Sequence, residues 1–391
     1  MTKAKKTTPT GQHPTVKRVT KGAAAKRSAA KRARAATAPP ATTGGPVTLA
    51  EAEALAQAHA PQRAVRKSAA VAERAATHAS VANERKKLDD QINAENERRI
   101  REYKATMSIM KSRGVKGLAP AAAPGPPRRG KGAAAAAAPP SASGQPLQIF
   151  AEGDSWFDYP VPLFGGSIVP RLKRLLGVPI LSLAKAGDEV RNMLGVEERK
   201  IIAEQLRNGS PTGGPWDVLL FSGGGNDIVG NPMALWIQDF NATVPPPNLI
   251  SKARFGAALE LVRAGYEDLI KLRDTLSPTT HLVFHGYDFA IPDGRGICGM
   301  GPWMKPTFDL RGFPGLSPAV AVVKAMLQQF AAILQSLASS HNDVTLINTQ
   351  GTLAGISSSW HNELHPSSAG FNKITAIFHA NLKTLFPGRV L

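Results

Sequence analysis

The sequence predicts an α/β fold over residues 147–391, a three-layer α/β/α sandwich around a parallel sheet of five strands. Two observations lead to this prediction. Short apolar runs alternate with amphipathic stretches throughout this part of the chain, and each apolar run ends in small or polar residues. Strands that alternate with helices pair in parallel through right-handed crossovers, and the helices then cover both faces of the sheet.

The apolar runs are the predicted strands, and they lie at residues 147–151, 179–183, 217–222, 281–285 and 344–348. The amphipathic stretches are the predicted helices, and they lie at about 166–177, 188–208, 253–276, 316–340 and 367–385. In a parallel sheet, ligands bind beyond the carboxyl ends of the strands. The residues that follow each strand are therefore the first candidates for a site.

The chain before residue 147 has a different composition. Residues 1–146 hold 28 Lys and Arg against 9 Asp and Glu, whereas the rest of the chain holds 20 of each, so the net charge of +19 belongs to the first part. Low complexity predicts a disordered basic tail at residues 1–46. Helix-forming residues predict one or two weakly packed helices at 47–113, and Pro, Ala and Gly predict a linker at 114–146.

The single cysteine, Cys298, cannot form an intramolecular disulfide and is compatible with a reducing compartment. No apolar run of a secretory signal follows the charged N-terminus, and no stretch holds the ~20 apolar residues of a membrane span. We therefore expect a cytoplasmic protein without a membrane span. An organelle transit peptide is the alternative, because residues 1–50 are rich in Ala, Lys and Arg and contain no acid.

Residues suited to acyl transfer follow the predicted strands. Ser155 lies just after the first strand, where its hydroxyl can stand on a tight turn as a nucleophile, with the amides of the next helix behind it. Gly187 follows the second strand and Asn226 the third, and their amides can stabilise an oxyanion together with the Ser155 amide. His365 precedes the last helix and can take the proton from Ser155. Taken singly, each residue also fits an ordinary cap, turn or loop position.

These residues stand in four blocks that resemble those of the SGNH (GDSL-like) hydrolases, which are named for their catalytic Ser, Gly, Asn and His. The blocks are Gly153-Asp154-Ser155-Trp156, Gly187, Gly225-Asn226-Asp227 and Asn362-Glu363-Leu364-His365-Pro366, in the family's order. The resemblance implies a flavodoxin-like sandwich and ester hydrolysis through an acyl-enzyme, without a metal or other cofactor. It also implies an oxyanion hole from Ser155, Gly187 and Asn226.

The chain departs from the family's pattern at Asn362. The family has Asp three residues before its histidine. Asn can orient the imidazole through its carbonyl oxygen, but it brings no charge to stabilise the imidazolium. Either Ser155 and His365 act as a dyad with Asn362 as a neutral orienting residue, or another acid contributes. Glu363 and Asp288 are the candidate acids, and Asn362 ranks first because of its position.

Four other motifs are excluded by the residues present or by their spacing. The stretch from His361 to His365 is not a zinc-protease motif, because Glu does not directly follow the first histidine and Pro366 disfavours a helix through the second. The glycines at 223–225 lack the Lys-Ser/Thr of a phosphate-binding loop and the spacing of a dinucleotide-binding loop. The chain also lacks the Gly-x-Ser-x-Gly elbow of the α/β-hydrolase fold.

Partners are less well defined by the sequence. The unpatterned segments 229–251 and 289–317 follow strands, so we expect them to wall the substrate site. Small-molecule, glycan and lipid esters all remain open as substrates. The alternative function is a nucleic-acid or polyanion-binding protein, in which the basic residues of 1–146 neutralise phosphates and the α/β domain is a scaffold. A coiled coil at 47–113 is disfavoured, because the segment lacks a Leu or Ile heptad.

Overall fold

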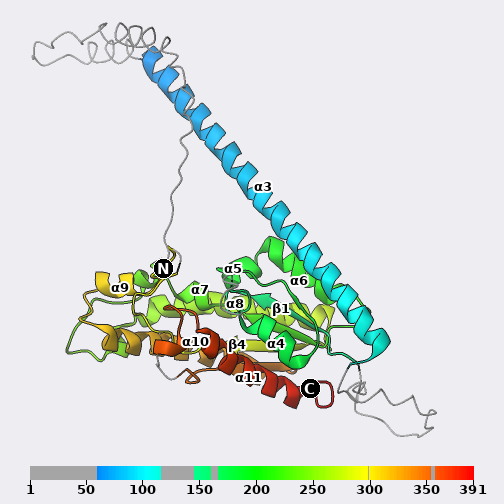
Figure 1. Ribbon diagram of the computed structural model, residues 1–391. Helices are drawn as coiled ribbons and strands as arrows, with labels where there is room; N and C mark the ends of the chain where they lie inside the picture. The colour runs from blue at the N-terminus through cyan, green and yellow to red at the C-terminus, as the bar shows by residue number, and fades with distance from the viewer. Residues whose placement is uncertain (1–59, 116–144, 160–165, 298, 354–356) are drawn as a thin grey trace, which may run out of the picture. The chain divides into compact units, whose positions relative to one another are not determined.

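The computed structural model describes residues 60–115, 145–159, 166–297, 299–353 and 357–391 (Figure 1). The chain divides into two compact units, Met1–Glu84 and Arg85–Leu391. The long helix α3 (Ala60–Arg113) begins in the first unit and ends in the second. The expected disordered tail at 1–46, most of the expected linker at 114–146 and Cys298 lie outside the described residues.

Five parallel strands form one sheet in the order β2-β1-β3-β4-β5. The strands are β1 (Ile149–Gly153), β2 (Ile180–Ser182), β3 (Val218–Ser222), β4 (His281–Gly286) and β5 (Val344–Asn348). Every residue of the two central strands β1 and β3 is buried, because helices cover both faces of the sheet. The predicted fold class is confirmed, and the strands lie close to their expected positions.

The main helices are α4 (Ile168–Leu176), α6 (Val196–Asn208), α8 (Lys252–Leu276), α10 (Leu316–Ser340) and α11 (Ser368–Leu385). The chain crosses the sheet in one direction from β1 to β2, and in the opposite direction from β2 through β3 and β4 to β5. Right-handed crossovers therefore place α4 on one face and α6, α8 and α10 on the other. The contacts agree, since α4 packs against α11, whereas α8 packs against α6 and α10 (Figure 1).

Shorter elements lie in the connections: α5 (Val190–Met193), α7 (Gly225–Ile228), α9 (Lys305–Leu310) and the 3-10 helices η2 (Asn231–Leu235), η3 (Pro246–Leu249) and η4 (Ser357–Ser359). The helix expected at 188–208 is broken into α5 and α6. The break falls at Gly195, whose backbone is extended with a ψ of 175°. A Cβ at this position would lie 2.8 Å from the carbonyl oxygen of Arg191, so only glycine fits the bend.

The C-terminal part of α3 packs more firmly than its alanine-rich sequence suggested. Within the unit Arg85–Leu391, the side chains of Tyr103 and Met107 are buried, with exposures of 3% and 0%. The ring of Tyr103 lies 5.3 Å from that of Trp216, which is itself fully buried. Both side chains lie on one face of the helix and belong to the same hydrophobic core as the sheet.

Among the described residues, one helix is long and apolar enough to cross a membrane by length and composition, and it is α10. Nine of its side chains are buried, and the helix packs on β4 and β5. Because its apolar face lies against the sheet, the apolar composition of α10 is that of a core helix.

Candidate active site

The turn that carries Ser155 begins at the end of β1, where Gly153 lies close to Ser222 at the end of β3. A Cβ at Gly153 would lie 2.7 Å from the carbonyl oxygen of Ser222, so only glycine permits this approach. The chain then turns, with the amide of Trp156 donating to the Asp154 carboxylate at 3.0 Å. Ser155 stands on this turn, and the described residues 156–159 that follow it form no helix, so the helix amides expected directly behind the serine are not among them.

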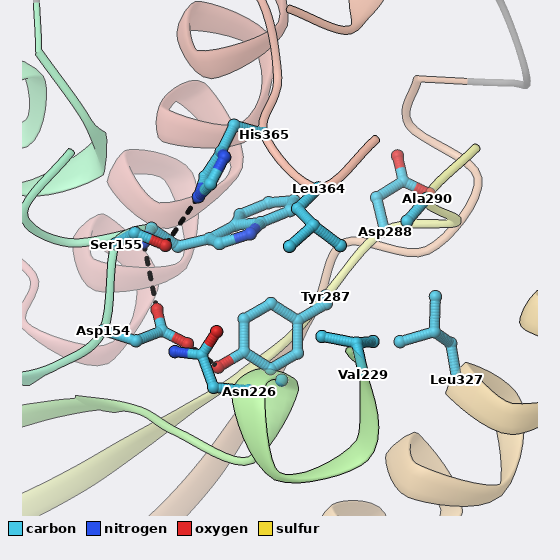
Figure 2. A pocket seen from close by; sticks show the side chains of 12 residues that line it. Asp154, Ser155, Asn226, Val229, Tyr287, Asp288, Ala290, Leu327, Leu364 and His365 are labelled. Carbon is cyan, nitrogen blue, oxygen red and sulfur yellow. Dashed lines mark hydrogen bonds between the residues drawn. The ribbon is translucent and has the colours of Figure 1, made fainter. Parts of the chain in front are cut away.

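The structure brings Ser155 and His365 together although 210 positions separate them in the sequence. The Ser155 Oγ lies 2.6 Å from the His365 Nε2, and both side chains are buried (Figure 2). His365 is held just before α11, which begins at the N-cap Ser367, whose side chain accepts the amide of Gly370. The ring of Tyr159 covers the imidazole at 4.4 Å between centroids.

Asn362 is the hydrogen-bond partner of the imidazole on its other side. Its Oδ1 lies 3.0 Å from the His365 Nδ1 and also accepts the backbone amides of Leu364 and His365, each at 2.9 Å. Because Oδ1 only accepts, the proton of the neutral imidazole belongs on Nδ1. The Nε2 is then free to accept the hydroxyl proton of Ser155. The Asn362 Nδ2 donates to the Tyr159 hydroxyl at 3.1 Å.

Neither candidate acid is hydrogen-bonded to His365 in the part of the chain that the structure describes. The Glu363 carboxylate is fully buried and accepts four backbone amides at 2.6 to 3.0 Å, from Gly294, Trp303, Met304 and Lys305. The Asp288 carboxylate accepts three amides, from Phe289, Gly351 and Leu353. Both side chains therefore fix loops, and Asn362 occupies the position beside the imidazole.

Burial keeps the imidazole neutral. It lowers the pKa of His365 to about 3, with a smaller contribution from the nearby His361. An uncharged imidazole with a free Nε2 is the form that can accept a proton from serine. Burial also lowers the pKa of His285 to about 3. The Nδ1 of His285 lies 3.0 Å from the Ser222 hydroxyl. Neither histidine carries a positive charge at neutral pH.

The Gly187 and Asn226 blocks lie side by side. The Asn226 Nδ2 donates to the carbonyl oxygen of Asp188 at 2.8 Å, next to Gly187. Gly187 has a φ of 89°, and the space around its Cβ position is open. Asn226 lines the same pocket as Ser155, while Gly187 is not among the pocket's described lining residues. No described residue accepts a hydrogen bond from the amides of Ser155 or Gly187.

An apolar pocket opens beside Ser155. Figure 2 shows Ser155 and His365 at one end of it and Leu327 at the other. Its apolar wall is formed by Trp156, Val229, Ala290, Leu327 and Leu364. Two of these residues begin the segments that the sequence predicted to wall the site. The cavity is small, about 30 Å³, and no group of three described His, Cys, Asp or Glu residues is placed to hold a metal ion.

Sequence reasoning missed Tyr159, which contacts both Asn362 and His365. The chain has only 4 tyrosines, and this one follows Ser155 by four residues. That proximity was the available signal. It did not reveal the contact, which depends on how the turn after Ser155 folds back toward residues 362–365.

No protein-family model and no curated protein matches the chain. Solved structures do match. A lipase from a goat rumen metagenome is 21% identical, over 60% of this chain and 96% of that one, with a TM-score of 0.41. A member of the lipolytic G-D-S-L family from Veillonella parvula is 17% identical, over 59% and 95%, with a TM-score of 0.36. A carbohydrate esterase of family 3 from Talaromyces cellulolyticus is 12% identical, over 61% and 98%, with a TM-score of 0.37.

These matched structures are described as a lipase, a member of the lipolytic G-D-S-L family and a carbohydrate esterase. The chain's own features are the sheet order, three blocks after the strands and a fourth just before α11, and the contact between Ser155 and His365. By these features the chain is similar to the SGNH/GDSL-like hydrolases.

Proposed function

We propose that the protein is a serine ester hydrolase in which Ser155 is the nucleophile and His365 the general base. The observation that carries the proposal is the 2.6 Å contact between the Ser155 Oγ and the His365 Nε2. The bond from His365 to Asn362 supports it, because it leaves Nε2 unprotonated. A nucleophile and base in hydrogen-bond contact, with a third group orienting the base, are the features that serine hydrolysis requires.

The reaction follows from this geometry. Ser155 transfers its hydroxyl proton to the His365 Nε2 as its Oγ bonds to the acyl carbon, and the carbonyl electron pair moves onto oxygen. The amides of Ser155 and Gly187 and the side chain of Asn226 stabilise that oxyanion. The bond to the alcohol then breaks, and His365 returns the proton to the alcohol. Water repeats the same steps on the acyl-enzyme and releases the acid.

The pocket supports a short acyl group. A cavity of about 30 Å³ has room for two or three atoms of the size of a water, which needs roughly 10–15 Å³. Its wall of Val229, Ala290, Leu327 and Leu364 offers apolar contacts, while Asp154 and Asp288 also line the pocket. Acetyl to butyryl esters are therefore the substrates to test first.

The test is activity-based labelling with a fluorophosphonate, together with hydrolysis of p-nitrophenyl acetate and butyrate. We expect the label on Ser155, and we expect Ser155→Ala and His365→Ala each to lower kcat by at least about a thousandfold. Ser340→Ala, at an exposed serine of α10, is the matched control and should keep full activity. A label on another residue, or full activity of Ser155→Ala, would overturn the proposal.

The polyanion-binding alternative rests on the basic residues of 1–146. The tail at 1–46 lies outside the described residues, and no observation in the described part of the chain favours this alternative.

A further inference from the structure

We propose that Tyr159 and His361 are positioning residues for the base, and that they extend its hydrogen bonds through Asn362 to a second histidine. The inference rests on the proposed function, since His365 is the base that they position. It identifies what stands in for the charged acid that the chain lacks at position 362.

Four consecutive contacts form the relay, which we define as Ser155, His365, Asn362, Tyr159 and His361. The Ser155 Oγ lies 2.6 Å from the His365 Nε2, and the His365 Nδ1 lies 3.0 Å from the Asn362 Oδ1. The Asn362 Nδ2 then donates to the Tyr159 hydroxyl at 3.1 Å. The Tyr159 hydroxyl lies 2.9 Å from the His361 Nδ1.

All the donors of the relay point the same way when His361 is neutral with its Nδ1 unprotonated. Serine donates to the imidazole, the imidazole to the amide oxygen, the amide nitrogen to the phenol, and the phenol to His361. Aligned hydrogen bonds polarise one another in a buried site. The imidazolium that forms at His365 therefore faces the negative end of a row of dipoles, which stabilises it without a carboxylate.

Tyr159 holds the base in two ways. Its hydroxyl fixes the side-chain amide of Asn362, and its ring covers the imidazole of His365 at 4.4 Å with an interplanar angle of 31°. The side chain is 7% exposed, and Asn362 is fully buried. Removing only the hydroxyl, as in Tyr159→Phe, keeps the ring contact and breaks the relay. The two roles can therefore be separated.

His361 makes the relay sensitive to pH. It is partly exposed, and its pKa is lowered by burial and then by Arg295, which donates to the carbonyl of Trp360 and pairs with Asp293. A protonated Nδ1 cannot accept the phenol proton, so the last bond of the relay is lost. The new charge also lies near His365 and opposes the imidazolium. Activity should therefore fall as pH drops and His361 becomes protonated.

The experiment measures kcat and KM for p-nitrophenyl butyrate between pH 4 and 8 in the full-length protein. We expect Tyr159→Phe to lower kcat about tenfold with little change in KM, because it removes an interaction of the charged state. His361→Gln keeps an acceptor for the phenol but cannot titrate. We expect its activity at pH 7 to stay within about threefold of the parent and its loss of activity to move to lower pH.

A rescue separates positioning from folding. In the Tyr159→Phe background, Asn362→Asp supplies a carboxylate to the imidazole, so kcat should recover by at least about fivefold. Tyr103→Phe on α3 and His379→Gln on α11 are the matched controls and should match the parent in kcat and pH profile. Thermal unfolding of each variant identifies those that fail to fold.

Three outcomes would overturn the inference: a Tyr159→Phe variant with the parent's kcat, a His361→Gln variant with the parent's acid limb, or no recovery by Asn362→Asp in a folded protein. A parent that hydrolyses no ester and takes no label on Ser155 would instead refute the proposed function. The two failures are thus distinguishable.

Discussion

At the scale of single residues, the site shows how two neighbouring side chains in one block take different tasks. Asn362 and Glu363 are both fully buried. Asn362 faces the imidazole, whereas Glu363 faces away from it onto four backbone amides. On charge alone, Glu363 would be the expected partner of His365. The direction of the backbone at this turn instead places Asn362 beside the imidazole.

Truncating Asn362 tests its orienting role. Asn362→Ala removes the acceptor for the His365 Nδ1 and for two backbone amides. We expect kcat to fall by about 10- to 100-fold, less than for Ser155→Ala, because the nucleophile and base remain. Steady-state kinetics of the parent, Asn362→Ala and Ser155→Ala in parallel would check this order of activities. A loss in Asn362→Ala as large as in Ser155→Ala would contradict a purely orienting role.

Glu363 is expected to affect stability more than chemistry. Glu363→Gln places an amide nitrogen where a carboxylate oxygen accepts backbone donors, so some of the four amides lose their partner. We expect about 3 kcal/mol of destabilisation, since each unsatisfied buried group costs about 1–3 kcal/mol. Urea unfolding measures this, and Glu97→Gln at an exposed position of α3 is the control. Unchanged stability with lost activity would return Glu363 to the list of catalytic acids.

The sequence was sufficient for the principal residues of the candidate site and insufficient for their supports. Ser155, Asn226 and His365 stand in recognisable blocks after strands or before a helix, and the structure brings all three to one pocket. Tyr159 could not be predicted, because its contact depends on the folding of a loop. The positions of Glu363 and Asp288 depend likewise on which backbone amides the insertions present.

At the scale of elements, α3 contacts the loops of the proposed site through the side chain of Arg99. The Arg99 guanidinium donates to the carbonyl oxygens of Ser182 and Ala184 at 3.1 and 3.2 Å, where β2 ends and the Gly187 block begins. Arg99 also forms an ion pair with Asp158, three residues after the proposed nucleophile Ser155. The helix thereby contacts the segments on both sides of the proposed oxyanion hole.

We therefore expect Arg99→Leu to reduce both stability and activity. The loss of two charge-assisted bonds to backbone carbonyls should cost about 2 kcal/mol. Activity should fall because the Ala184 and Asp158 segments lose a common anchor. Arg101→Leu, whose side chain is 68% exposed, is the control and should change stability by less than about 0.5 kcal/mol. Equal behaviour of the two variants would show that the helix is not coupled to the site.

At the scale of the whole molecule, the alternation of strands and helices was enough to predict the fold. It did not predict that the C-terminal part of α3 packs on the core. Strand positions were predicted because buried parallel strands form uninterrupted apolar runs bounded by polar residues. The packing of α3 was underestimated, because the large side chains of Tyr103 and Met107 stand among charged and small residues and form no continuous apolar run. A few large side chains can attach a helix whose average composition predicts weak packing.

Buried ionisable groups give the protein a predictable pH dependence of stability. Burial raises the pKa of Glu152 to about 8 and that of Asp154 to about 7, and it lowers those of His285 and His365 to about 3. The two carboxyl groups, whose pKa values are raised, favour the folded state below about pH 4, and this contribution is lost as pH rises toward 8. The two histidines, whose pKa values are lowered, favour the folded state above about pH 6.5, and their contribution is lost as pH falls toward 3.

The two opposing changes of folding stability with pH cancel between about pH 4.5 and 6.5. We therefore expect maximum stability in this range and a decline on both sides of it. Each titrating group contributes about 1.4 kcal/mol per pH unit. Urea unfolding from pH 3.5 to 8.5 would measure the curve. Glu152→Gln should flatten its alkaline side. A steady rise in stability from pH 5 to 8 would contradict these assignments.

Acylation of Ser155, with His365 accepting its proton, can be observed by trapping the acyl-enzyme. The protein is mixed with p-nitrophenyl butyrate, quenched in acid within the first turnovers, and mapped by peptide mass spectrometry. We expect a butyryl group on the peptide that contains Ser155, and its absence from Ser155→Ala. Ester hydrolysis that proceeds with the acyl group on another residue would contradict the proposed role of Ser155.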